Sequence, residues 1–330
     1  MKTGTASLGN FWEVNSSSSF DKLALDTFNL QYNRNTIYRS FCDLINRSPC
    51  DVRKVEDIPY LPISFFKSKQ VVSFHEKPKG YFSSSKTSGL VPSKHFYRNL
   101  DDYTKSFSIG FKNIYGNISD YVFLALLPSY MNRKGSSLIF MVDKLIQKSC
   151  HSESGFYLNN FKDLVQKIKF LEARGQKTIL LGVSFALLDL LEYHSFQLKN
   201  TLIMETGGMK GKRKETTRKE LHHILSQGFG CKKIHSEYGM TELLSQAYSK
   251  GDGKFECQPW MRVSIRENQD PFQPLYNGQA GGINIIDLAN RDSCAFIATD
   301  DIGKVYSNQE FEVLGRFDHS EVRGCNLMVI

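Results

Sequence analysis

The sequence predicts an α/β protein: a parallel-sheet core flanked by helices, with a smaller antiparallel β subdomain at the carboxyl-terminal end. Within residues 121–250, short apolar runs alternate with amphipathic segments, a pattern typical of strands and helices that build a parallel sheet. Beyond them, short strand-like runs are separated by polar turns. Because 41% of the 330 residues are hydrophobic, the chain can bury a sizeable core. We expect a helical flank at 1–80, a nucleotide-binding α/β core at 81–250 and a small β-rich subdomain at 251–330.

The amino-terminal flank is expected to be helical with polar breaks. Serines 16–19 are expected to form a short loop and helix cap. The sequence PYLP at 59–62 favours an extended stretch, because proline restricts the residue before it. Within the segment 20–45, the apolar residues near helical spacing are Phe20, Leu23, Phe28, Tyr32 and Ile37.

The expected core alternates strands with helices. Glycines at Gly175 and Gly228 are expected to end two of the helices. The predicted strands are YVFLALL (121–127), TILLGV (178–183), TLIME (201–205) and KKIHSEY (232–238), and the predicted helices span 136–149, 161–175, 184–194 and 215–228.

The final part of the chain is expected to form the small antiparallel subdomain. Its strands are predicted at GGINIIDL (281–288), CAFIATDD (294–301), GKVYS (303–307) and FEVLGRF (311–317).

Composition and charge exclude several classes of protein. The seven cysteines form no CxxC pair, which favours a reducing cytoplasm over a disulfide framework or a zinc site. No apolar run is long enough to predict a membrane span, and the amino terminus lacks the pattern of a signal peptide. The net charge of +8 favours anionic partners, and much of it lies in KGKRKETTRK at 210–219. No aromatic residues interleave with these charges, so we favour a solvated helical turn and expect no nucleic-acid partner.

Ligands of an open parallel sheet bind beyond the carboxyl ends of its strands, which directs attention to the loops there. TLIME is followed by Thr206, Gly207 and Gly208, and the two glycines allow a flat ligand to approach the backbone. KKIHSE leads into YGMTELLSQ, where a hydroxyl and a carboxylate are expected to open a helix whose amino terminus attracts anions. The loop YFSSSKTSGLVPSKH, 81–95, is rich in hydroxyl groups and suits a polyphosphate.

Four motifs in order, SSSKTSG, YGMTE, ATDD and GRFD, spread over residues 83–318, resemble the motif set of the acyl-adenylate-forming superfamily. Within it the sequence is similar to the LuxE-type acyl-protein synthetases, most closely in GRFDHSEVRGCNLMV near the carboxyl end. Most superfamily members continue into a further domain that supplies a catalytic lysine. This sequence is expected to lack that domain, as LuxE-type proteins do.

The resemblance implies roles for individual residues. Tyr238, with Gly239 and Met240 in the same loop, would flank the adenine base; Thr241 would contact the α-phosphate. Glu242 would hold Mg²⁺, whose charge offsets that of the phosphates. The resemblance also implies a phosphate loop of Ser84, Ser85, Thr87, Ser88 and Gly89, adenine contacts from Gly207 and Gly208, and a ribose contact from Asp301 with Arg316 beside it.

Lys86 departs from the family pattern, which has glycine at this point of the phosphate loop. A side chain there either blocks the tight turn or supplies the cation that the missing domain's lysine would give. Both readings stay open.

In LuxE-type proteins a cysteine near the carboxyl end accepts the acyl group, and Cys325 occupies that place. The thiolate is the attacking form, and Arg323 would favour it. The alternative is that Cys325 is an inert thiol.

Each of these residues also has an alternative reading. Glu242 taken alone suits a helix-opening carboxylate, and Asp301 with Asp300 suits a turn before Gly303. His222 is expected to face solvent. The sequence GVSFA, 182–186, approximates a nucleophile elbow with Ser184 as the nucleophile, although alanine replaces the last glycine and a helix cap explains the serine as well.

We therefore predict a cytoplasmic, acid-activating ligase that uses ATP and Mg²⁺ to convert a fatty or other carboxylic acid into an acyl-adenylate. The acyl group would pass to Cys325 and then to a protein partner, which the resemblance implies is an acyl reductase. The rival hypotheses are an ATP-independent acyltransferase and a non-catalytic binding protein whose phosphate loop is spoiled by Lys86.

Overall fold

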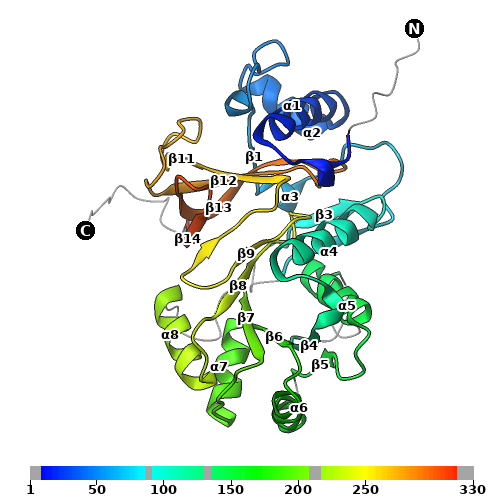
Figure 1. Cartoon of the computed structure of the whole chain (residues 1–330). Helices are drawn as coiled ribbons and strands as arrows, with labels where there is room; N and C mark the ends of the chain where they lie inside the picture. Colours follow the sequence, from blue (N-terminus) through cyan, green and yellow to red (C-terminus); the bar gives the residue numbers. More distant parts are fainter. Residues whose placement is uncertain (1–8, 86–90, 129–134, 159, 208–216, 318–330) are drawn as a thin grey trace.

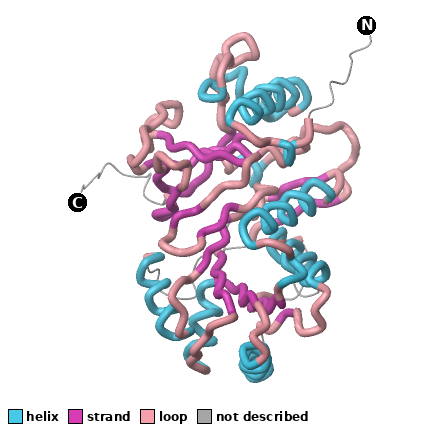
Figure 2. Tube along the Cα trace, in the orientation of Figure 1, coloured by secondary structure: helices cyan, strands magenta, loops and turns pink. Residues whose placement is uncertain are grey.

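The computed structural model describes residues 9–85, 91–128, 135–158, 160–207 and 217–317. Two six-stranded sheets form its framework, one built mainly of parallel strands and one mainly of antiparallel strands (Figure 1). Helices lie around both sheets, and loops connect the sheets near the middle of the molecule (Figure 2). The predicted α/β class is thus confirmed.

The amino-terminal part is helical and packs against the antiparallel sheet. Ser16 caps α1 (Ser17–Arg34) by accepting a hydrogen bond from the Ser19 amide at 3.2 Å, so Ser16 is the cap and the next three serines form the first turn. Helix α1 buries Phe20, Ala24 and Phe28 at helical spacing. The other elements are η1 (Phe11–Glu13), α2 (Thr36–Leu44), η2 (Val55–Asp57), β1 (Leu61–Pro62) within PYLP, and α3 (Phe65–Ser68).

Strand β1 pairs in parallel with β13 (Phe296–Val305) of the carboxyl-terminal sheet. Residues far apart in the sequence thereby share one sheet. Next comes an antiparallel hairpin of β2 (Gly80–Ser83) and β3 (Lys94–Tyr97), which packs on α4 (Asp101–Tyr115) through ring contacts such as Phe82 with Tyr103. The loop of this hairpin carries SSSKTSG.

The first sheet has the order β5-β4-β6-β7-β8-β9, and its first five strands run parallel while β9 is antiparallel. The four predicted strands and four predicted helices of this region are all present. The elements are η3 (Ile118–Asp120), β4 (Val122–Leu126), α5 (Ser137–Ser149), β5 (Gly155–Phe156), α6 (Phe161–Ala173), β6 (Thr178–Val183), α7 (Ser184–Tyr193), β7 (Thr201–Thr206), α8 (Arg218–Phe229), β8 (His235–Tyr238) and β9 (Ala247–Ser249).

The predicted glycine stops are right for one helix and wrong for the other. Gly175 follows α6 with a φ of +65°. Helix α8, however, continues through Gly228 to Phe229 and ends at Gly230, whose φ of +64° is the left-handed conformation that glycine adopts freely. Gly228 lies inside α8, where Leu191 of α7 packs so close that a Cβ would clash with it, so this glycine serves a close approach between helices and does not end one.

The second sheet has the order β10-β14-β13-β12-β11. The prediction of separate strands at 294–301 and 303–307 is wrong, because β13 runs through both. A register shift between Ile302 and Gly303 marks a bulge, and Gly303 lets the strand pass close to the Glu312 carbonyl without a clash. The remaining strands are β10 (Lys254–Phe255), β11 (Met261–Arg266), β12 (Gly281–Asp287) and β14 (Phe311–Arg316).

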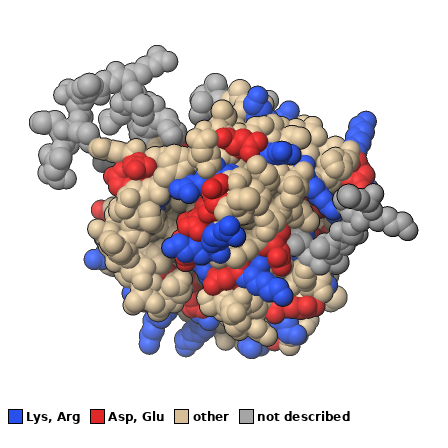
Figure 3. Space-filling view, turned by 90° about the horizontal axis from the view of Figure 1, so that it is seen from above, with Lys and Arg blue, Asp and Glu red and all other residues tan. Residues whose placement is uncertain are grey.

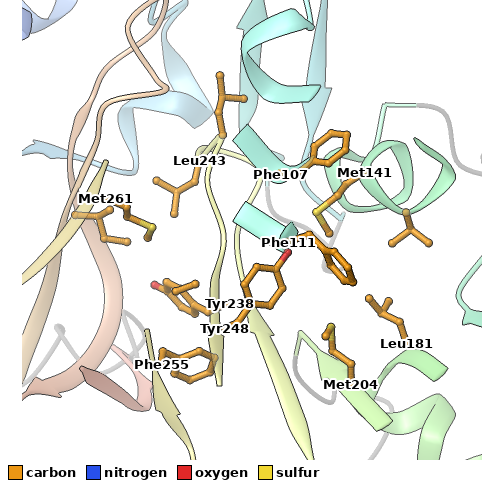
Figure 4. Close-up of a cluster of buried hydrophobic side chains, with 14 of the residues drawn as sticks. Phe107, Phe111, Met141, Leu181, Met204, Tyr238, Leu243, Tyr248, Phe255 and Met261 are labelled. Atoms are coloured by element: carbon orange, nitrogen blue, oxygen red, sulfur yellow. The ribbon is translucent and has the colours of Figure 1, made fainter. Parts of the chain in front are cut away.

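A continuous hydrophobic core joins the helices to the sheets. Figure 4 shows Phe107 and Phe111 of α4 beside Met141 of α5, with Tyr238 and Tyr248 from β8 and β9 nearby. Tyr248 also exchanges two backbone hydrogen bonds with Glu256, at 3.1 and 2.8 Å. This bridge links β9 of the first sheet to the residue that follows β10 of the second sheet. Within the described ranges, no helix has the length and apolar character needed to cross a membrane.

Candidate functional site

The carboxyl ends of β6, β7 and β8 lie at one edge of the parallel sheet, as the register of these strands requires. Strand β7 ends at Thr206, and the exposed Gly207 follows with a φ of +65°. The Ser184 hydroxyl donates to the Gly207 carbonyl at 2.9 Å. A buried side chain therefore fixes the backbone at the point where the sequence predicted an adenine contact.

Tyr238, at the end of β8, connects the two sheets. Its hydroxyl donates to Asp301 Oδ2 at 2.7 Å, and Arg316 Nε donates to Asp301 Oδ1 at 3.2 Å. Asp301 and Arg316 are direct partners in the β13–β14 ladder. Burial, followed by the charge of Asp301, holds the pKa of Tyr238 well above its ordinary value, so the phenol stays a donor. The structure thus brings three predicted site residues together and places Asp301 in a strand, not in a turn.

The rest of the YGMTE motif forms an irregular loop and opens no helix, so the expected helix at this point is absent. Gly239 is exposed, and a Cβ there would lie 2.5 Å from Glu237 Oε1. Met240 packs against the hydrophobic core. The Thr241 carbonyl accepts a hydrogen bond from His95 Nδ1 at 2.9 Å, which attaches the loop to the β2–β3 hairpin.

Glu242 is 5% exposed, and burial raises the pKa of its carboxyl group. A hydrogen bond with Ser93 and the charges of Arg316 and Lys67 lower this pKa in turn. The carboxyl group of Glu242 therefore faces the hairpin and a cationic environment. A helix-opening carboxylate would be solvated instead, so that alternative reading of Glu242 is wrong.

Ser93 also closes the base of the SSSKTSG loop. The Ser84 amide donates to the Ser93 carbonyl at 3.1 Å, and the Ser93 amide donates to Ser84 Oγ at 2.9 Å. Ser85, the next residue, is exposed. Ser93 is consequently a neighbour of both Glu242 and the base of the predicted phosphate loop. The predicted residues Lys86, Thr87, Ser88 and Gly89 lie outside the described residues.

Glu242 and the hydroxyl groups at the base of the SSSKTSG loop are the described groups that could hold a magnesium nucleotide. Among the residues that the structure describes, no group of three or more His, Cys, Asp or Glu side chains is placed to hold a metal ion. Mg²⁺ usually binds one or two carboxylates together with phosphate oxygens and water. Glu242 beside the base of a hydroxyl-rich loop matches that arrangement.

Histidine 95 was missed by the sequence analysis. Its ring is 1% exposed, and burial lowers its pKa to about 4, so the ring is neutral at pH 7. A neutral ring that donates from Nδ1 is a fixed anchor for the Thr241 carbonyl. Only its position two residues after Ser93, in a loop rich in polar residues, offered a signal in the sequence.

A pair of buried carboxyl groups was also missed. Burial, with a smaller contribution from the nearby Glu205, raises the pKa of Glu237 to about 7, and the Thr206 hydroxyl donates to this side chain. Glu205 contacts Arg218 and His222 of α8, each at 3.4 Å. The expectation that His222 faces solvent is therefore wrong.

Ser184 is not placed as a nucleophile. Its side chain is 1% exposed, and its hydroxyl donates to the Gly207 carbonyl and, at 3.4 Å, to Glu205. It is the first residue of α7 and caps nothing, because Val183 occupies the cap position without a side-chain bond. The nucleophile-elbow reading and the helix-cap reading of GVSFA are therefore both wrong. Ser184 instead holds the loop after β7 through its hydrogen bond to the Gly207 carbonyl.

Three further predictions concern residues outside the described ranges. Cys325 and Gly208 lie there, as does most of the basic segment 210–219.

On the face seen from above, acidic and basic side chains are interspersed (Figure 3). Arg262 of β11 pairs with Asp21 of α1 at 2.7 Å, and Arg39 pairs with Asp43 within α2 at 3.6 Å.

Comparison with known proteins places the chain in a family. Residues 10–330 match the family model described as Acyl-protein synthetase, LuxE. The chain is 25% identical over 335 residues to the long-chain-fatty-acid–luciferin-component ligase of Aliivibrio fischeri. The aligned region covers 93% of this chain and 86% of that protein. The protein of the same name from Vibrio harveyi is 22% identical, with the same two coverages.

Solved structures share the fold. A 2-hydroxyisobutyryl-CoA ligase in complex with 2-HIB-AMP and CoA superposes with a TM-score of 0.69 and 12% identity, over 93% of this chain and 72% of that one. ATP-bound MatB from Rhodopseudomonas palustris gives a TM-score of 0.54 and 18% identity over 74% of this chain, which spans only 49% of the MatB chain. The motifs, the α/β fold and the match over residues 10–330 agree: this chain belongs to the acyl-protein synthetase family LuxE.

Proposed function

We infer that this chain, as a member of the acyl-protein synthetase family, is an acid-activating ligase. We propose that it activates a long-chain fatty acid with ATP and Mg²⁺ as an acyl-adenylate, and that Cys325 then accepts the acyl group. The observation that carries the first step is the meeting of Glu242, the base of the SSSKTSG loop and the Asp301–Arg316 pair around one loop. The names of the two curated relatives and the ATP-bound MatB structure support the choice of substrates.

The described residues would hold the nucleotide by complementary groups. Asp301, already paired with Tyr238 and Arg316, offers a fixed carboxylate for ribose hydroxyls. Gly207 leaves its backbone open to a flat base. Thr241 and the hydroxyl groups of the SSSKTSG loop would contact phosphate oxygens, and Glu242 would hold the cation that offsets the charge of those phosphates.

The reaction balances as two displacements. A carboxylate oxygen of the acid attacks the α-phosphorus of ATP, the bond to the β-phosphate oxygen breaks, and pyrophosphate leaves. The Cys325 thiolate, after losing its proton to solvent, then attacks the acyl carbon and releases AMP. ATP supplies the driving force, because a carboxylate is a poor electrophile whereas AMP is a good leaving group.

The fate of the thioester is part of the proposal. We expect a protein partner, an acyl reductase, to take the acyl group from Cys325 in the cytoplasm. A test mixes the acylated protein with candidate reductases and NADPH and measures aldehyde. Aldehyde formation with one reductase, lost in Cys325→Ala, would identify the partner.

Intact-protein mass spectrometry tests the main proposal. Wild type, Cys325→Ala and Glu242→Gln are incubated with ATP, Mg²⁺ and fatty acids of increasing chain length, and pyrophosphate is measured in parallel. We expect an ATP-dependent, hydroxylamine-labile mass gain in wild type only, with pyrophosphate released by wild type and Cys325→Ala but not by Glu242→Gln. A mass gain that needs no ATP would indicate the acyltransferase instead. Nucleotide binding with neither product would indicate the binding protein.

A further inference from the structure

A buried carboxylate outside the four motifs receives hydrogen bonds from the YGMTE loop. Asp287, at the end of β12, is completely buried, and its Oδ2 accepts from the amides of Leu244 and Ser245, both at 2.9 Å. Its Oδ1 accepts from the Ser245 hydroxyl at 2.6 Å and from the Ala289 amide at 3.1 Å. Four donors therefore offset the cost of burying this one side chain.

Three residues further on, Asn290 holds the other side of the same loop. Its side-chain amide donates to the Glu242 carbonyl at 2.7 Å and to the Cys294 carbonyl at 3.2 Å, and the residue is completely buried. One short segment, residues 287–290, thus binds the Glu242 carbonyl and the amides of Leu244 and Ser245.

The loop needs such partners because it is irregular and buried. Glu242, Leu243, Leu244 and Ser245 are each less than a tenth exposed, yet they belong to no helix or strand. Buried backbone groups without partners are costly, so side chains must satisfy what regular structure does not. The Leu243 amide donates within the loop to the Met240 carbonyl at 3.2 Å, whereas the amides of Leu244 and Ser245 donate to Asp287.

Segment 287–290 is itself held firmly. Gln31 of α1 donates to the carbonyls of Asn290 and Ser293 at 3.0 and 3.2 Å and accepts from the Ala295 amide at 2.9 Å. On the other side, Trp260 Nε1 donates to the Ser245 hydroxyl at 2.9 Å. A hydrogen-bond network of this kind favours one arrangement of its members over slightly displaced alternatives.

We propose that Asp287 and Asn290 are positioning residues that together fix the place and direction of the Glu242 carboxyl group. They act through the backbone on both sides of Glu242 and need no contact with a substrate. The consequence for turnover rests on the proposed function, whereas the consequence for the loop itself does not.

The test compares Asp287→Asn and Asn290→Ser with Asn284→Ala as a matched control. Asn284 lies on strand β12 like Asp287, is also buried, and accepts a hydrogen bond from Arg266 at 2.9 Å, away from the loop. Hydrogen exchange of the backbone amides and the Mg²⁺ dependence of pyrophosphate release are measured on all four proteins. Asp287→Asn keeps the shape of the side chain, and Asn290→Ser is a second route should that variant fold poorly.

We expect the amides of Leu244 and Ser245 to exchange at least tenfold faster in Asp287→Asn, while β6 and β7 stay protected. Half-saturation by Mg²⁺ should rise, or turnover should fall, by roughly 10- to 100-fold in both variants, as is usual for groups that orient a metal ligand. The control should retain the wild-type Mg²⁺ dependence and loop exchange. Unchanged exchange at these two amides, or changes matched by Asn284→Ala, would overturn the proposal. If wild type releases no pyrophosphate, the proposed function fails, and the exchange data still decide the role of Asp287.

Discussion

Glu237 should make the stability of this protein fall as the pH rises through neutrality. Its carboxyl group is 6% exposed, and burial raises its pKa from 4.5 to about 7. The folded chain therefore binds a proton that the unfolded chain has already lost in the window between these two values. Folding stability that this group contributes is complete below pH 4.5 and is lost as the pH rises towards 7.

The magnitude follows from the width of that window. Raising the pKa of Glu237 from 4.5 to about 7 corresponds to about 3 kcal/mol, of which about 2 kcal/mol falls between pH 5.0 and 7.5. Glu237→Gln removes the titration but keeps the size of the side chain and an acceptor for the Thr206 hydroxyl. The variant should therefore gain about 2 kcal/mol relative to wild type between these two pH values.

Urea denaturation at pH 5.0 and 7.5, followed by tryptophan fluorescence, measures this difference. The difference between the two proteins is needed because buried histidines titrate over the same range in both. Parallel pH profiles for wild type and Glu237→Gln would refute the reasoning, since they would show that Glu237 is already ionised in the folded protein at pH 5.0.

Three further predictions test other contacts. Tyr238→Phe removes the hydroxyl that donates to Asp301 Oδ2 and should cost about 1.5–3 kcal/mol in thermal or urea denaturation; an unchanged midpoint would contradict the bond. Gly230→Ala should cost at least about 1–2 kcal/mol, because its φ is +64° and a Cβ would lie 2.6 Å from Gln197 Oε1; calorimetry measures the loss, and Gly175→Ala is a control with the same conformation but open space. His95→Gln should lose the wild-type gain in stability between pH 4 and 6.5, because the folded ring with a pKa of about 4 stays neutral while the unfolded ring is charged; equal slopes in both proteins would exclude a neutral His95.

Much of the fold follows from local patterns. The four apolar runs of the core became the strands β4, β6, β7 and β8, and each amphipathic segment became a helix. The errors lie where a tertiary neighbour decides the outcome. Gly228 lies inside α8 at a close approach to Leu191, and Gly303 lets β13 pass the Glu312 carbonyl, so neither glycine ends its element. Glycine marks both a break and a close approach, and the sequence does not distinguish them.

The site shows the same division. Motifs pointed to Tyr238, Glu242, Asp301 and Arg316 as candidate site residues, because each lies in a run of residues with a recognisable order. His95 could not be found in that way, since it meets Thr241 across 146 positions of the chain.

By itself, the sequence determined the four strands and four helices expected in the core, the acyl-protein synthetase family and the loops that carry its motifs, because periodicity and motif order are local properties of a chain. Only the tertiary structure decided that Asp287 and Asn290 hold the YGMTE loop, that Ser184 is a support and that Glu237 retains a proton near pH 7. The physical reason is burial. Hydrogen-bond partners and proton affinities depend on which groups lose water together, and residues distant in the chain lose it together only when the two sheets pack.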